Sequence, residues 1–184
     1  MQLTRAELEE GIDYVRAAPR DTGTIELIVC RPAVGAREVL PEATLDATFG
    51  LVGDNWLARG SSRTADGTAH PDKQVTIMND RAALLVAAGD KDRRKLAGDQ
   101  LYLDFDISPA NLPPGTRLAI GAAVLEVTDS PHLGCEKFAA RFGHEAWRFV
   151  NSRTGRALRL RGMNVRVAVP GIVRQGDAVR KLAD

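Results

Sequence analysis

Short apolar runs, each ended by glycine, proline or aspartate, fill the sequence from Gly23 onward and constrain the fold more than any other feature. Runs of this length indicate β-strands, because helices in globular proteins need longer periodic segments. We predict strands over Thr24–Arg31, Arg37–Ala47, Gln74–Met78, Gln100–Phe105, Arg117–Thr128, Asn164–Val169 and Ala178–Leu182. Since no βαβ unit repeats between them, the pattern favours a barrel or sandwich over a parallel α/β sheet.

Helical patterns are few and surround this β-rich part. Thr4 followed by Glu7 is a capping box, and apolar residues recur at helical spacing up to Pro19, which predicts a helical extension over residues 1–20. Three more helices are predicted, over Asp80–Ala88 with Asn79 as its cap, Glu136–Phe142 and His144–Val150. A chain of 184 residues fits one domain, so we assign 1–184 to a single mainly β (α+β) domain with its core over 23–182.

Cys135 carries the strongest chemical signal, because it lies in a loop between a strand-like run and the helix predicted over Glu136–Phe142. Free amide groups and the dipole at a helix start stabilise a thiolate, which is the nucleophilic and metal-binding form of cysteine. His132, Lys137 and Arg141 can add positive charge to the same place. Most free cysteines are small buried hydrophobes, so a structural and a functional interpretation both stay open.

A basic stretch follows, with five arginines and no acidic residue among them: Arg153, Arg156, Arg159, Arg161 and Arg166. Converging guanidinium groups hold phosphate or carboxylate, so the stretch predicts an anion site. Two of these arginines also alternate with leucines, as they would in an edge strand with a solvated face. The sequence gives the two interpretations equal support.

The segment Gly50–Trp56 is a third candidate site. Its two glycines permit close approach of a ligand to the backbone, and Asp54 and Asn55 can hold the ligand's polar edge. An ordinary turn explains the same residues without a ligand.

Composition excludes several classes of function. The net charge is only +1 with 27% charged residues, which gives no electrostatic case for binding nucleic acid or a membrane surface, so small molecules are the expected partners. Neither a signal peptide nor an apolar run long enough to span a bilayer is found, which predicts a cytoplasmic protein. Cys30 and Cys135 form no zinc or disulfide pattern and are expected to be free thiols, with Cys30 structural.

Several short segments follow one another in a family-like order. They are Gly50–Asp54, a histidine-containing loop before Gln74–Met78, Gly98–Leu101, Arg117–Gly121 leading through Val124–Thr128 to Cys135, and Gly171–Asp177. In order and spacing they resemble the MOSC domain, found at the C-terminus of molybdenum-cofactor sulfurases, in mitochondrial amidoxime-reducing components and as stand-alone bacterial proteins. The resemblance spans roughly residues 23–182, and the family's single cysteine falls on Cys135.

This resemblance implies a closed β-barrel, here with an N-terminal helix, and a molybdenum cofactor in which a pterin binds the metal. It implies Cys135 as a metal ligand and the basic stretch as a site for the pterin's phosphate. His132, three residues before the cysteine in the same loop, is a second catalytic candidate because of that position alone. The residues expected to contact the cofactor are Asp54, Asn55, Asp99, Lys137, Arg156, Arg159 and Arg161.

The chain departs from the family pattern in three places, one of which is Gly98-Asp99-Gln100-Leu101 where the family usually has Gly-Glu-Asn-Leu. Many members have proline directly before the cysteine, where this chain has Gly134, and many have His-Gly-Gly where this chain has His70-Pro71-Asp72. These differences indicate a divergent stand-alone branch of the family.

Three functions are compatible with these residues. The first is a molybdenum-dependent enzyme that reduces N-hydroxylated small molecules with electrons from partner proteins, since the chain has no flavin, haem or iron–sulfur motif. The second is a metal-free sulfur carrier that forms a persulfide on Cys135, where Lys137 stabilises the anion and His132 gates protons. The third is a ligand-binding barrel without turnover. The sequence leaves open whether the protein is an oxidoreductase, a sulfur transferase or not an enzyme.

Overall fold

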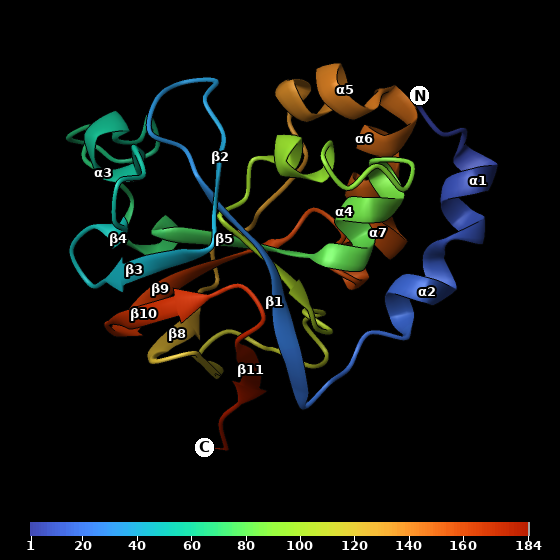
Figure 1. The fold of residues 1–184 in the computed structure, drawn as a ribbon. Coiled ribbons are helices and arrows are strands. Elements are labelled where there is room, and N and C mark those ends of the chain that lie inside the picture. The colour runs from blue at the N-terminus through green and yellow to red at the C-terminus, as the bar shows by residue number, and fades with distance from the viewer. Residues whose placement is uncertain (184) are drawn as a thin grey trace.

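The computed structural model describes residues 1–183, in which strands close into a mixed β-barrel (Figure 1). Within these residues seven strands form the barrel in the order β1-β6-β5-β9-β8-β7-β11, and β11 pairs with β1 to close it. Only β5 and β6 run parallel; the other neighbours are antiparallel. The strands are β1 (Thr22–Cys30), β5 (Val75–Asn79), β6 (Leu101–Asp104), β7 (Arg117–Ile120), β8 (Ala123–Val127), β9 (Met163–Val169) and β11 (Ala178–Lys181). The predicted fold class, a mainly β closed barrel with helices, is confirmed.

A small second sheet lies beside the barrel, in the order β10-β3-β4. Its strands are β3 (Glu42–Asp46), β4 (Gly50–Leu51) and β10 (Gly171–Arg174), while β2 (Glu38–Leu40) pairs with the end of β1. The strand predicted over 37–47 is therefore two strands that meet at Pro41, which has no N–H to continue a ladder. β10 was not predicted as a strand, because its apolar run is only Ile172 and Val173, between Gly171 and Arg174.

A bulge in β1 decides which of its side chains enter the barrel. The pairing of β1 with β6 shifts register between Ile25 and Leu27, which reverses the alternation of the following residues. Ile25 and Ile28 consequently lie in the core inside the barrel, whereas Leu27 and Val29 lie in a second core under the helices. One strand thus contributes to both hydrophobic cores.

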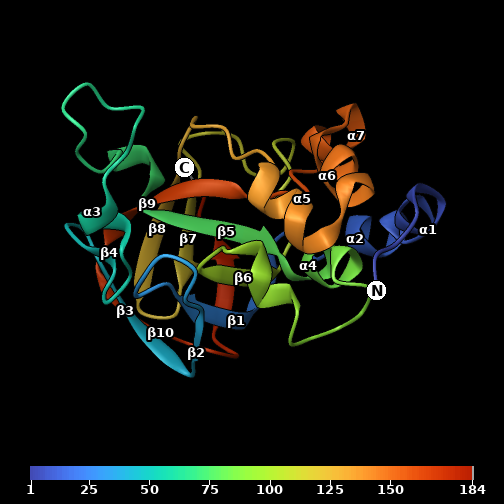
Figure 2. The same cartoon turned by 90° about the horizontal axis from the view of Figure 1, so that it is seen from above.

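The helices cover the barrel unevenly. Figures 1 and 2 both place α1, α2 and α4 to α7 on one side and the short α3 on the other, next to the second sheet. Their bounds are α1 (Arg5–Glu10), α2 (Ile12–Arg16), α3 (Trp56–Arg59), α4 (Asp80–Val86), α5 (Glu136–Phe142), α6 (His144–Asn151) and α7 (Arg153–Ala157), with 3₁₀ turns η1 (Pro71–Lys73) and η2 (Arg94–Ala97). None of the helices in the described part of the chain is long and apolar enough to cross a bilayer.

The local start signals act as predicted. Thr4 and Glu7 form the capping box of α1, and Asn79 caps α4 by accepting a hydrogen bond from the Ala82 amide. The N-terminal extension is nevertheless two helices, broken at Gly11. A Cβ at Gly11 would lie 2.3 Å from Leu85 Cδ1, so the backbone approaches α4 closely there.

The interpretation of Arg159 and Arg161 as part of an edge strand is wrong. Ser152 caps α7 by accepting a hydrogen bond from the Gly155 amide at 3.0 Å, and a turn follows the helix up to β9. Arg159 lies in that turn with a positive φ of 47°. A local cap therefore overrides the alternation of arginine and leucine in this segment.

Candidate functional site

Cys135 lies where the sequence predicted, at the N-cap position of α5. The residue is exposed to solvent. Its side chain makes no capping hydrogen bond, so the thiol is not occupied by the helix start. The preceding residue is fixed instead: the Gly134 amide donates to Asn151 Oδ1 at 2.9 Å, and its carbonyl accepts from Asn151 Nδ2 at 3.0 Å and Trp147 Nε1 at 2.9 Å. Helix α6 thereby holds the loop that presents the cysteine.

The same contacts explain why glycine stands where many MOSC members have proline. A proline at 134 would lose the amide that donates to Asn151. A Cβ there would also lie 2.9 Å from Asn151 Nδ2 and 3.0 Å from Val150 Cγ2. In this chain the loop is stabilised by docking on α6, and that docking requires Gly134.

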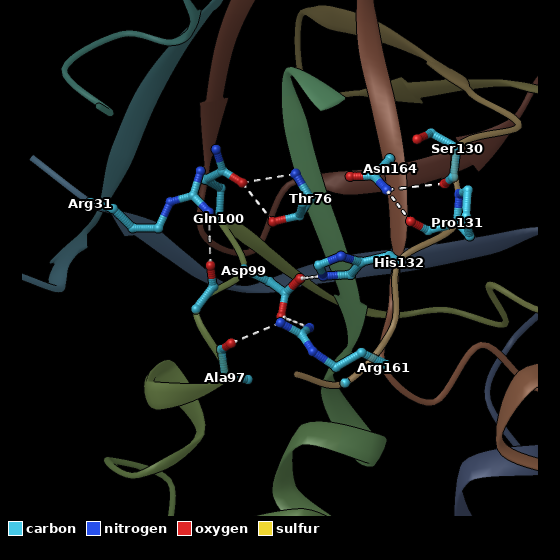
Figure 3. A network of polar contacts seen from close by, with 12 residues as sticks. Arg31, Thr76, Ala97, Asp99, Gln100, Ser130, Pro131, His132, Arg161 and Asn164 are labelled. Carbon is cyan, nitrogen blue, oxygen red and sulfur yellow. Dashed lines mark hydrogen bonds and ion pairs between the residues drawn. The ribbon is translucent and has the colours of Figure 1, made fainter. Parts of the chain in front are cut away.

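The upstream half of the loop is attached to the barrel. Asn164 on β9 is buried and donates from Nδ2 to the carbonyls of Ser130 at 3.0 Å and Pro131 at 3.3 Å (Figure 3). The loop is therefore held at both ends, by the barrel wall on one side and α6 on the other. His132 lies between these two anchors.

His132 is part of a buried charge network (Figure 3). The carboxylate of Asp99, which is fully buried, accepts from Arg161 Nη1 at 2.6 Å and contacts His132 Nε2 at 2.8 Å. Burial by itself favours the neutral acid, but Arg161 and His132 outweigh it and lower the pKa of Asp99. The carboxylate is thus ionised at neutral pH. Burial, followed by Arg161, also lowers the pKa of His132, so the imidazole is neutral at pH 7.

The tautomer of His132 follows from this network. An ionised carboxylate can only accept hydrogen bonds, so Nε2 of the neutral ring carries the proton and donates to Asp99. Nδ1 is left as an acceptor. The Asp99 contact therefore fixes both the orientation of the ring and the place of its proton.

A pocket of about 630 Å³ opens beside Cys135 and His132. Among the described residues that line it, seven are cationic and none is acidic: Arg31, Arg37, Arg59, Lys73, Lys137, Arg141 and Arg161. We call it the cationic pocket. Two of these charges are neutralised from behind, since Asp54 pairs with Arg31 and Asp99 with Arg161. The remaining excess of positive charge favours an anion in the pocket.

Arg37 and Arg141 converge over Gly98, although they come from different parts of the chain. A Cβ at Gly98 would lie 3.0 Å from Arg37 Nη2 and 3.5 Å from Arg141 Nη1. Gly98 also has a φ of +89°, which favours glycine. Burial, then the charges of Arg141 and Arg31, lower the pKa of Arg37. Like charges held this close are stabilised by an anion between them.

Asp54 has a different position from the one predicted. Its carboxylate, with no exposed side-chain surface, accepts from Arg31 Nε and Nη2, both at 2.8 Å, and from the Trp56 amide at 2.9 Å. It positions Arg31 and does not itself line the pocket. Its neighbour Asn55 does line the pocket, and its Oδ1 is buried without a hydrogen-bond partner.

The basic stretch does not converge on the cationic pocket. Of its five arginines only Arg161 lines the cationic pocket. Arg156, Arg159 and again Arg161 line a second pocket, and Arg166 pairs with Glu126 on the barrel. The cations that do surround the pocket were largely missed by the sequence: Arg31, Arg37, Arg59 and Lys73. They lie in three separate segments with no common motif, so no local signal identifies them.

The sequence of the chain matches a known domain family. A family model described as the MOSC domain matches residues 65–180, more than half of the 184-residue chain. The chain belongs to the MOSC domain family. Comparison with curated protein sequences gives no match.

Solved structures agree on the fold of this MOSC domain. The YuaD protein from Bacillus subtilis is 16% identical, with a TM-score of 0.62, over 86% of this chain and 94% of that one. YiiM from Escherichia coli is 19% identical, with a TM-score of 0.56, over 88% of this chain and 70% of that one. YiiM from Geobacillus stearothermophilus is 11% identical, with a TM-score of 0.52, over 89% and 74%. At such identities the similarity establishes the fold alone.

Proposed function

We propose that this MOSC protein binds a molybdenum cofactor in the cationic pocket, with Cys135 as a metal ligand, and reduces N-hydroxylated small molecules. The observation that carries the proposal is the position of an exposed cysteine on the lining of a pocket with a large excess of positive charge. Family membership adds to it, because MOSC domains are associated with this cofactor in general.

The pocket residues fit an anionic cofactor. The volume of about 630 Å³ lies within the ordinary range of ligand pockets. Three polar atoms of the lining residues are buried without a hydrogen-bond partner: Arg37 Nε, Arg161 Nε and Asn55 Oδ1. Buried polar groups in native proteins almost always have such a partner. A phosphorylated, hydrogen-bonding ligand satisfies such groups directly or through water.

The chain's own residues have separable parts in this proposal. Arg31, Arg37 and Arg141 bind the phosphate of the cofactor, and the soft thiolate of Cys135 suits a sulfur-rich molybdenum centre. The cofactor, when bound, supplies two-electron redox chemistry at the metal. His132, held by Asp99, offers Nδ1 as a proton acceptor at the wall of the pocket. Electrons come from a partner protein.

A second candidate is a sulfur carrier, and the exposure of Cys135 favours it, since a carrier thiol has to meet its donor. In that step the Cys135 thiolate attacks the outer sulfur of a donor persulfide. A new S–S bond forms on Cys135, and the donor cysteine leaves as a thiolate. Lys137, on the pocket lining next to it, then stabilises the anionic persulfide.

The test is the molybdenum and pterin content of protein produced anaerobically in a host that makes the cofactor. The wild type is expected to contain molybdenum near one atom per chain, and Cys135→Ser is expected to lose most of it. Cys30→Ala is the matched control, because Cys30 is the other free cysteine and does not line the pocket. This control should keep its metal.

The result that would overturn the proposal is a wild type without metal and pterin, or a Cys135→Ser variant with wild-type molybdenum content. Mass spectrometry of the same anaerobic samples then decides the second candidate. A mass increase of one sulfur atom on Cys135, absent from the serine variant, would support the carrier.

A further inference from the structure

A second pocket of about 540 Å³ lies on the other side of the loop that leads to Cys135. His132 and Arg161 line both this pocket and the cationic pocket, so they form the wall between them. Ser130 and Pro131, which Asn164 holds against the barrel in Figure 3, belong to the lining of the second pocket. The two pockets therefore share a wall, and their other lining residues are different.

The second pocket has few charged residues, and the hydrogen bonds of Arg156 and Arg159 go to uncharged groups. Arg159 donates from Nη1 to the carbonyls of Leu112 at 2.7 Å and Ile107 at 3.2 Å, and Arg156 donates from Nε to the Asn151 carbonyl at 3.0 Å. Backbone carbonyls thus orient both guanidinium groups without neutralising them.

One acidic residue, Asp129, lines the pocket among the described residues, and no ion pair joins it to either arginine there. Arg161 is neutralised by Asp99. Arg156 and Arg159 against Asp129 leave a net charge of +1 in the pocket.

The rest of the lining is largely apolar, with six such residues: Pro109, Pro114, Pro131, Leu133, Val150 and Met163. Three of them are prolines, whose rings are rigid and lose little entropy when a ligand covers them. An apolar wall next to one net positive charge matches a ligand that has an apolar body and a single negative charge.

We propose that the second pocket binds a small monocarboxylate with an aromatic or aliphatic body, independently of any cofactor in the cationic pocket. The carboxylate lies at Arg159 and Arg156, and the apolar body lies against the prolines and Leu133. A phosphate monoester fits less well, because its second negative charge would be desolvated beside apolar groups with no cation to match it.

The test is isothermal titration calorimetry of the full chain at pH 7 with two probes, 3-phenylpropionate and octanoate. Each is compared with its neutral amide, which keeps the apolar body and removes the charge. We expect the carboxylates to bind and the amides to bind roughly tenfold or more weakly, as the loss of a charged hydrogen bond implies. Equal affinity of acid and amide would overturn the proposal.

Variants locate the bound probe. Arg156→Gln and Leu133→Asp change exposed residues of the lining, and each is expected to weaken carboxylate binding about tenfold. Arg153→Gln is the matched control, since Arg153 is an exposed arginine on the same helix outside the lining. Arg37→Gln controls for binding in the cationic pocket. Unchanged affinity in both lining variants, or loss of binding in Arg37→Gln, would contradict this site.

Discussion

Replacing Asp99 by asparagine should destabilise the protein strongly, because among residues 1–183 this carboxylate is the only acidic partner of Arg161 and His132. Asparagine keeps one acceptor oxygen, so one of the contacts to His132 at 2.8 Å and Arg161 at 2.6 Å is lost. The guanidinium of Arg161, with 8% of its side chain exposed, then has no counter-charge. Breaking one partner of a buried ion pair costs about 3 to 5 kcal/mol.

A loss of this size is easily measured. For a chain of this length it corresponds to a fall in Tm of roughly 6 to 20 °C, observable by circular dichroism. Asp92→Asn is the matched control, because Asp92 is exposed, and it should change the stability by less than about 0.5 kcal/mol. A Tm of Asp99→Asn within 2 °C of the wild type at pH 7 would refute the ion-pair argument.

The pH dependence gives a second, independent check on the same residue. The pKa of Asp99 is lowered on folding, so its contribution is fully present above the pKa of an unfolded aspartate, about 4, and is lost as the pH falls below it. Asp99→Asn has no such group. The difference in unfolding free energy between wild type and variant should therefore be largest near pH 7 and shrink towards pH 3. A constant difference across this range would contradict the assignment.

Two further predictions use matched pairs of residues. Asn79→Ala removes two buried hydrogen bonds, the cap of α4 and the bond to the Phe105 carbonyl. It should lower the free energy of unfolding, measured in urea, by about 2 to 4 kcal/mol. The control Thr4→Ala, at the exposed start of α1, should lower it by about 1 kcal/mol or less. Gly98→Ala and Gly176→Ala share a φ of +89° and the same backbone strain, but only at Gly98 does a Cβ meet an arginine. Both variants should lose about 1 to 2 kcal/mol of stability. Only Gly98→Ala should weaken phosphate binding, about tenfold by calorimetry, and equal phosphate affinities would contradict the anion site.

The parts of the fold that the sequence predicted well are those with local causes. The capping box at Thr4, the cap at Asn79 and the helix over Glu136–Phe142 are each encoded within a few residues, and each is present as predicted. The cysteine at the start of α5 follows from the same local signal. The edge strand around Arg159 was wrong because a local cap at Ser152 competed with an equally local alternation.

In the candidate site, too, features with a local cause in the sequence were predicted and features that depend on tertiary contacts were not. The sequence by itself determined the β-rich barrel, the place of Cys135 and the family, because these depend on short patterns and their order. Only the tertiary structure decided which charges meet. Closure of the barrel and docking of α5 bring Arg31, Arg37 and Arg141 to one pocket and bury Asp99 between the Arg161 guanidinium and the His132 imidazole. Electrostatic energy depends on distance in space and on burial, and the sequence specifies neither until the chain has folded.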